Sequence, residues 1–147
     1  MLRRKFLQNS GALLAALLLW PKLLFAKTWN KPAFETTKIS ETLAALGVTQ
    51  PKMSQDILIT APALAENGAV VQVEVSSNIA NTESIAILVE KNPTPLIAEF
   101  KLSPELEAFV VTRIKMAETS DVTVVVKAGE QFFMQTKNVV VLENGCG

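Results

Sequence analysis

The chain has 147 residues, of which 49% are hydrophobic and 19% charged, a size and composition that suit one domain rather than two. It contains one cysteine, no histidine and no tyrosine, which excludes an internal disulfide and removes the usual general base and the commonest metal ligand. Residues 27–147 carry ten basic against 14 acidic side chains, so neither nucleic acid nor anionic lipid is an expected partner.

The N-terminus has the form of an export signal. Residues 3–7 (Arg-Arg-Lys-Phe-Leu) precede an apolar run over residues 11–20, which is well short of the roughly 20 residues that span a bilayer. The adjacent arginines resemble the bacterial twin-arginine signal, and an ordinary secretory signal is the alternative. We therefore expect a signal peptide over residues 1–26, cleavage after Ala26, no membrane span in the mature chain, and a periplasmic location.

One short helix is expected over residues 37–46. Ile39, Leu43 and Leu46 recur at helical spacing, and Gly47 stands where a helix would stop. We expect this helix to cover an edge or an end of the sheet that follows, which would protect the sheet from pairing with other chains.

From residue 51 the hydrophobic pattern changes to alternation with period two, which predicts β-strands. Turn residues separate the strands at intervals of about 8 to 12 residues, a spacing typical of two packed antiparallel sheets of immunoglobulin type. The sequence therefore predicts an all-β sandwich domain over residues 27–142, with eight strands at 57–60, 70–75, 84–89, 97–102, 109–115, 121–127, 131–136 and 139–142.

The body of the chain offers no catalytic arrangement. Phe100, Phe109 and residues 132–133 (Phe-Phe) lie inside strand patterns and are expected to pack in the core or on the sheet surface, while Arg113 and Lys115 suit a solvated face. No glycine-rich phosphate loop, Cys and His cluster or serine triad is present. We expect neither enzymatic activity nor a cofactor.

The chemistry is expected in the C-terminal tail, residues 143–147. Its only reactive group is the thiol of Cys146, which glycine flanks on both sides, and glycine gives the backbone wide conformational freedom. Five extended residues reach roughly 16 to 18 Å. We therefore predict that Cys146 carries a covalently attached substrate on a swinging arm formed by Asn144, Gly145 and Gly147. An accidental cysteine and an intermolecular disulfide are the alternatives.

These residues resemble the SoxY proteins of bacterial sulfur oxidation. The resemblance covers nearly the whole chain, from the twin-arginine signal to the glycine-flanked cysteine. Between these ends, the matching segments are 43–47 (Leu-Ala-Ala-Leu-Gly), 65–68 (Ala-Glu-Asn-Gly), 90–95 (Glu-Lys-Asn-Pro-Thr-Pro), 98–100 (Ala-Glu-Phe) and 112–115 (Thr-Arg-Ile-Lys).

The resemblance implies an immunoglobulin-like fold and a complex with a second small β-protein, SoxZ. It implies that the haem enzyme SoxXA conjugates thiosulfate to Cys146, that the hydrolase SoxB removes sulfate, and that a sulfane dehydrogenase or another acceptor treats the remaining sulfur. The family usually ends in Gly-Gly-Cys-Gly-Gly, whereas this chain ends in Asn144-Gly145-Cys146-Gly147. Asn144 tolerates left-handed backbone angles, so its cost in flexibility is small.

Two other functions fit parts of the pattern. A periplasmic binding or adhesion module with the same sandwich would bind through loops such as residues 92–95 and would not need Cys146. A thiol peroxidase or oxidoreductase would need a base or a resolving cysteine near the thiol, and the sequence contains no second cysteine and no histidine.

Overall fold

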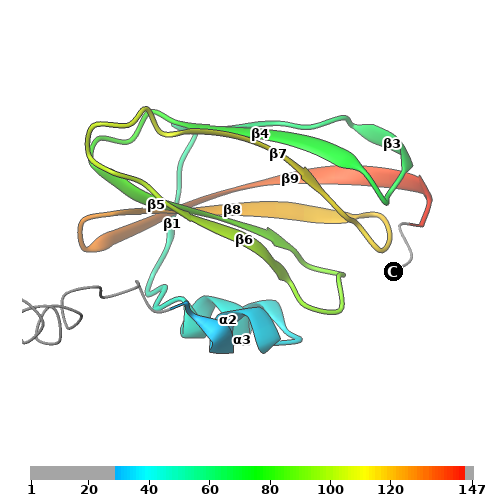
Figure 1. Ribbon diagram of the computed structural model, residues 1–147, viewed down its shortest axis with the longest axis horizontal. Coiled ribbons are helices and arrows are strands. Elements are labelled where there is room, and N and C mark those ends of the chain that lie inside the picture. Colours follow the sequence, from blue (N-terminus) through cyan, green and yellow to red (C-terminus); the bar gives the residue numbers. More distant parts are fainter. Residues whose placement is uncertain (1–28, 145–147) are drawn as a thin grey trace, which may run out of the picture.

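The structure is a computed structural model that describes residues 29–144, and it is a two-layer β-sandwich with two short helices (Figure 1). In chain order its elements are α2 (Lys31–Glu35), α3 (Ile39–Ala45), β1 (Lys52–Met53), β2 (Ile57–Thr60), β3 (Leu64–Asn67), β4 (Val71–Ser77), β5 (Thr82–Val89), β6 (Leu96–Lys101), β7 (Phe109–Ile114), β8 (Ser120–Ala128) and β9 (Gln131–Glu143).

The larger sheet has the strand order β1-β9-β8-β5-β6, with β3 added on β9, and the smaller sheet has the order β2-β4-β7. Pairing is antiparallel except at β9, where β1 and β3 both run parallel to it. β9 is the longest strand, with 13 residues. Its first part pairs with β8 and its last part with β3, so it extends beyond the end of its antiparallel partner.

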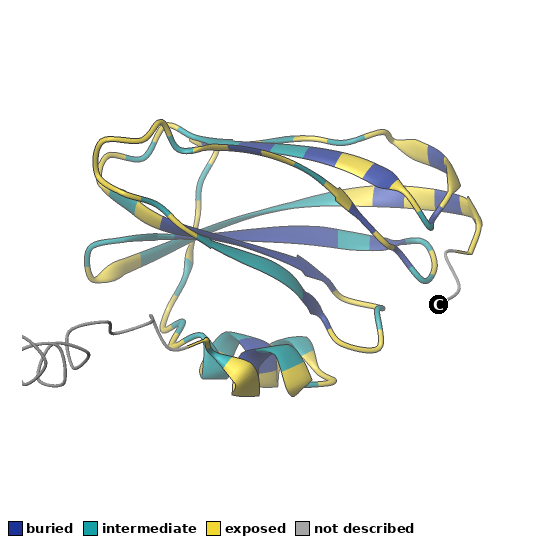
Figure 2. Cartoon of the chain, viewed as in Figure 1, coloured by how far each residue is buried: buried dark blue, intermediate teal, exposed yellow. Residues whose placement is uncertain are grey.

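The main core lies between the two sheets and consists of aliphatic side chains on alternating strand positions. Val73 and Val75 of the small sheet face Ile85, Ile87 and the inward side chains of β8 and β9. Figure 2 shows this alternation as buried and exposed bands along β4 and along the last part of β9. The middle of β5 and β8 is instead buried without interruption, which means that both faces of these strands are covered.

The two helices cover the outer face of the large sheet. Ala33 of α2 and Leu43 of α3 pack against Ala86, Leu88 and Val125, which point away from the main core. Figure 1 shows the two helices beneath the large sheet, on the side opposite the small sheet. The expectation that the helix covers an edge or an end is therefore wrong: it covers a face, because β5 and β8 have apolar side chains on both sides.

The predicted fold class, an all-β immunoglobulin-like sandwich, is confirmed, with differences in detail. The strands expected at 131–136 and 139–142 form one continuous strand, and β1, β3 and α2 were not predicted. The boundaries of the expected domain, 27–142, stay a prediction. No helix between residues 29 and 144 combines the length and the apolar character that crossing a membrane requires. The expected signal peptide, 1–26, lies outside the described residues.

Candidate functional site: the tail-bearing end of the sandwich

The last strand is held on one side up to its final residue and on the other side up to Val141. On one side β3 pairs with it in parallel, with Asn67 opposite Glu143, and the Gly68 amide donates a hydrogen bond of 2.8 Å to the Glu143 carbonyl oxygen. On the other side the Thr119 hydroxyl accepts a hydrogen bond of 2.9 Å from the Val141 amide. The C-terminal tail therefore begins from a fixed point.

The loops around this point are joined to one another by hydrogen bonds. The half-buried Asn92, in the β5–β6 loop, donates to the Lys115 carbonyl and accepts from the Ala117 amide, both at 2.8 Å. Met116 lies between Lys115 and Ala117 in the β7–β8 loop, and its amide donates a hydrogen bond of 2.7 Å to the Gly68 carbonyl. The loops β5–β6, β7–β8 and β3–β4 thus form one braced platform beside the end of β9.

Three segments that carry the resemblance to SoxY come together here. Residues 65–68 form the last part of β3 and the turn after it, 90–95 form the β5–β6 loop, and 112–115 form the end of β7. In Figure 1 all three lie at the same end of the sandwich as the last residues of β9. Segments far apart in sequence therefore build the surface from which the tail leaves.

Of the predicted site residues, only Asn144 is described. It is exposed and is the first residue after β9. Gly145, Cys146 and Gly147 lie outside the described residues, so the prediction that Cys146 holds the substrate stays a prediction.

The platform also contains charged side chains. Lys91 and Glu118 form an exposed ion pair of 3.5 Å between two of its loops. Over residues 29–144, no three His, Cys, Asp or Glu side chains are grouped so that they could hold a metal ion. Exposed Leu64, Val140 and Leu142 form an apolar strip along the outer side of β3 and β9, directly before the tail.

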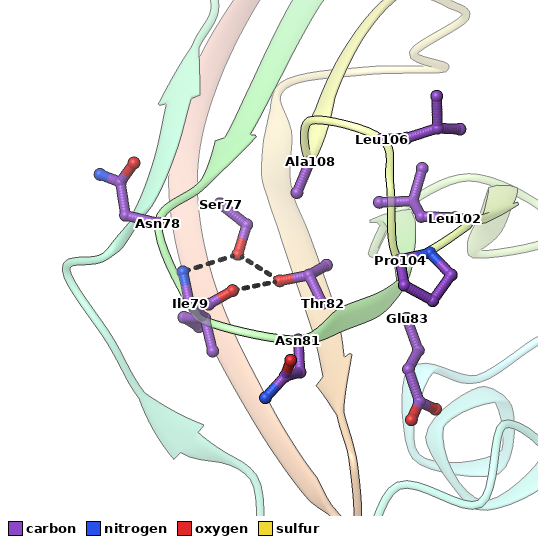
Figure 3. A pocket seen from close by; sticks show the side chains of 10 residues that line it. All are labelled: Ser77, Asn78, Ile79, Asn81, Thr82, Glu83, Leu102, Pro104, Leu106 and Ala108. Carbon is purple, nitrogen blue, oxygen red and sulfur yellow. Dashed lines mark hydrogen bonds between the residues drawn. The ribbon is translucent and has the colours of Figure 1, made fainter.

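A pocket of about 490 Å³ lies at the opposite end of the sandwich, between the β4–β5 and β6–β7 loops (Figure 3). Hydrogen bonds link Ser77 to Thr82 at 2.9 Å and Thr82 to the Ile79 carbonyl at 2.8 Å, so these polar groups already have partners. The strand β4, with seven residues, spans roughly 23 Å between the two ends, more than the reach of the tail.

The aromatic residues have structural positions. Phe100 and Phe133 pack against the main core, Phe132 packs against the helix-covered cluster, and Phe109 lies half-exposed on the surface of the small sheet. Packing in the core or on the sheet surface, as predicted, is confirmed for all four. Arg113 is exposed, as expected for a solvated face.

Comparisons with known proteins agree with this arrangement. The family model described as "Sulfur oxidation protein SoxY" matches residues 43–146. Among solved structures, the sulfur carrier protein SoxY from Chlorobium limicola f thiosulfatophilum is 34% identical, with a TM-score of 0.64, over 69% of this chain and 93% of that one. The search of curated proteins found no match.

A second solved structure shares only the fold. It is a superoxide reductase (neelaredoxin) from Ignicoccus hospitalis, 16% identical, with a TM-score of 0.51 over 58% of this chain and 78% of that one. The match to the SoxY family covers most of the chain and includes the platform and Cys146. The chain belongs to the SoxY family of sulfur oxidation proteins.

Proposed function

We propose that this protein is a periplasmic carrier of sulfur compounds, which holds thiosulfate-derived intermediates covalently on Cys146 and presents them to the enzymes of the Sox system. A role as a sulfur-oxidation carrier follows from membership of the SoxY family. The location, the attachment residue and the cargo are the proposed part.

The observation that carries the proposal is the extent of the family match, which runs to residue 146 and so includes the single cysteine of the chain. The anchoring of β9 supports it further. A tether is effective when its root is fixed and its length matches the distance to be covered, because the local concentration of its end then reaches the millimolar range. Here Gly68 and Thr119 hold the strand up to the residue before Asn144.

The tail was predicted over residues 143–147, but Glu143 is the last residue of β9, so the proposed arm begins at Asn144, with Asn144, Gly145 and Gly147 as its flexible part. Residues 144–147 extend roughly 13 to 14 Å from the sheet, which suffices to enter a narrow active-site channel. Glu143 is the nearest charged side chain in sequence, and its negative charge disfavours the thiolate. The thiol therefore reacts when a partner enzyme provides the environment, and the carrier itself is not the catalyst.

The proposed partners are those of the Sox system. A SoxZ-like β-protein would form a heterodimer or a larger complex with this chain, SoxXA would conjugate the cargo, and SoxB would hydrolyse it. A sulfane dehydrogenase is a further candidate. The proposed route to the periplasm is the twin-arginine signal of residues 1–26, which exports proteins already folded.

An intact-mass measurement tests the attachment. The mature protein, with a SoxZ-like partner if it requires one, is incubated with thiosulfate and a SoxXA-type conjugating enzyme. We expect a mass increase that reductant removes and that Cys146→Ser abolishes. An unmodified wild type, under conditions in which the enzyme conjugates thiosulfate to another SoxY protein, contradicts the proposal.

The binding or adhesion module is the second candidate, and the structure weakens its main premise. The loop 92–95 was its expected binding surface, but the Asn92 side chain uses both its oxygen and its nitrogen to hold the neighbouring loop. The two functions also differ in their need for the thiol: binding by a module survives Cys146→Ser, whereas carriage of sulfur does not.

A further inference from the structure

The pocket between the β4–β5 and β6–β7 loops is built on hydrogen bonds that join its two sides. The Leu102 amide donates to the Glu83 carbonyl oxygen at 2.8 Å, and the Ser77 amide donates to the Ala108 carbonyl oxygen at 2.9 Å. The volume of about 490 Å³ falls within the range of about 300 to 1,000 Å³ that is usual for small-molecule sites. A ligand therefore meets walls that are already in place.

The two sides of the pocket differ in chemistry (Figure 3). The β6–β7 loop contributes an apolar side that includes Leu102, Pro104 and Leu106. The ends of β4 and β5 contribute the half-buried hydroxyl groups of Ser77 and Thr82. Leu106 is 62% exposed, so a ligand would gain stability by covering it. The lining therefore suits a molecule that has both an apolar part and a polar group.

The two hydroxyl groups can accept further hydrogen bonds but have no hydrogen left to donate. Thr82 donates its hydroxyl hydrogen to the Ile79 carbonyl oxygen at 2.8 Å. Ser77 must therefore be the donor in the bond of 2.9 Å between the two hydroxyls. The Ser77 oxygen in turn accepts a bond of 3.3 Å from the Ile79 amide. Because a hydroxyl oxygen has two lone pairs, one remains on each oxygen for a ligand that donates.

The surroundings of the pocket are acidic. The two loops and the first residues of β5 contain three glutamates and no lysine or arginine. One of them, Glu83, pairs with Lys127 at 3.1 Å, and its carboxylate points away from the hydroxyls in Figure 3. The other two, Glu105 and Glu107, are exposed and flank Leu106 in the chain. Their negative charge near the mouth of the pocket favours a cation over an anion.

We propose that this pocket binds a small organic cation, an ammonium group on an apolar body. An ammonium group has three donors and no acceptor, so it can donate to the free lone pairs of Ser77 and Thr82. Its apolar body would lie against Leu102 and Leu106. An anion such as thiosulfate offers no hydrogen to these oxygens and is repelled by the acidic loops. The site thus differs from that of the proposed sulfur cargo in position and in charge, and it goes beyond the carrier function.

Titration followed by nuclear magnetic resonance tests the site with three probes of similar shape. Cyclohexylammonium, cyclohexanol and cyclohexanecarboxylate are added separately to the ¹⁵N-labelled mature protein. We expect the cation to cause saturable shifts of the amide signals of Ile79, Leu102 and Leu106, with an affinity at least about tenfold above that of the carboxylate. Cyclohexanol should bind more weakly than the cation. An absence of shifts with the cation, or equal affinities for the cation and the carboxylate, would overturn the proposal.

Variants separate the contributions of the lone pairs and of the charge. Thr82→Val keeps the shape of the side chain and should weaken binding of the cation about fivefold to tenfold. Since this change also removes hydrogen bonds within the β4–β5 loop, a double variant acts on charge alone. Glu105→Gln with Glu107→Gln, at exposed side chains, should weaken the cation about threefold and leave cyclohexanol unaffected.

The matched control is Glu66→Gln with Glu90→Gln, which removes two exposed carboxylates at the tail-bearing end of the sandwich. We expect it to leave the affinities of all three probes unchanged. A loss of cation binding in the control as large as in the Glu105 and Glu107 variant would show that the cation is not held at this pocket. An unchanged cation affinity in both Thr82→Val and the Glu105 and Glu107 variant would reject the proposal as well.

Discussion

Asn92 joins two loops of the braced platform through its side chain. Its side chain makes two hydrogen bonds to the backbone of the β7–β8 loop, at Lys115 and Ala117. The prolines of residues 92–95 and the resemblance to SoxY marked this loop in the sequence. The bracing role of Asn92 could not be predicted, because its hydrogen-bond partners are more than 20 residues away in the chain. Thr119 and Gly68 were not predicted as site residues for the same reason.

We predict that Asn92→Ala lowers the free energy of unfolding by about 2 kcal/mol, because the half-buried Ala117 amide loses its partner. The matched control is Asn138→Ala, which removes one exposed hydrogen bond of 2.7 Å to Asp121. We expect a loss below about 1 kcal/mol for the control. Urea denaturation of both variants gives the comparison, and equal losses would contradict a bracing role for Asn92.

At the level of elements, the end of β9 is the feature that links fold and arm. Alternation predicted both of its halves correctly as strand. It did not predict their continuity, because Lys137 and Asn138 interrupt the apolar pattern, and pairing with β8 carries the strand through them. The parallel strand β3 was missed because its sequence, Leu-Ala-Glu-Asn, has low β propensity and its partners lie 76 residues away.

We predict that Thr119→Val loosens the last residues of β9 without unfolding the sandwich. The Val141 amide then loses its acceptor, so its hydrogen exchange should become about tenfold faster, as expected for an opening made about 1.4 kcal/mol easier. The control is Thr94→Val, at an exposed threonine of the β5–β6 loop. Amide exchange followed residue by residue separates the two, and an unchanged rate at Val141 would show that the Thr119 bond does not hold the strand.

The helix pair gives a second prediction at this level. Ala33 is completely buried between α2 and the large sheet, whereas Ala44 is on the exposed side of α3. Ala33→Leu should cost about 1 to 3 kcal/mol through overpacking, while Ala44→Leu should change stability by less than about 0.5 kcal/mol. Thermal denaturation measures both. Similar melting temperatures for the two variants would mean that the helices are not packed tightly on the sheet.

At the scale of the whole molecule, the hydrophobic pattern predicted the sandwich correctly. The expected position of the helix, at an edge or an end of the sheet, was wrong. The signal for the correct position was present: residues 85–89 are all apolar, and residues 122–126 are apolar except for Thr123. Strands buried on both faces have this pattern. Such strands need apolar cover on their outer face as well as on their core face. The helical segment was the only predicted element outside the two sheets, so it was the candidate for this cover. Strand order brings the three segments that resemble SoxY to one end of the sandwich, and no local sequence pattern predicts that they meet there.

Because β5 contributes side chains to both the main core and the helix-covered cluster, we expect the described domain to unfold as a single unit. Ile87 points into the main core and is fully buried, while its neighbour Leu88 packs under the helices. Ile87→Ala should cost about 2 to 5 kcal/mol, whereas Leu58→Ala, at a side chain that is 52% exposed, should cost much less.

Far-ultraviolet circular dichroism reports the sheets, and the fluorescence of Trp29, which packs beside Phe34, reports the helices. Coincident transitions in wild type and in Ile87→Ala are the expected result. If the helix signal were lost first while the sheets stayed folded, the helix pair would be an accessory to the sandwich and the anchoring of the tail would not depend on it.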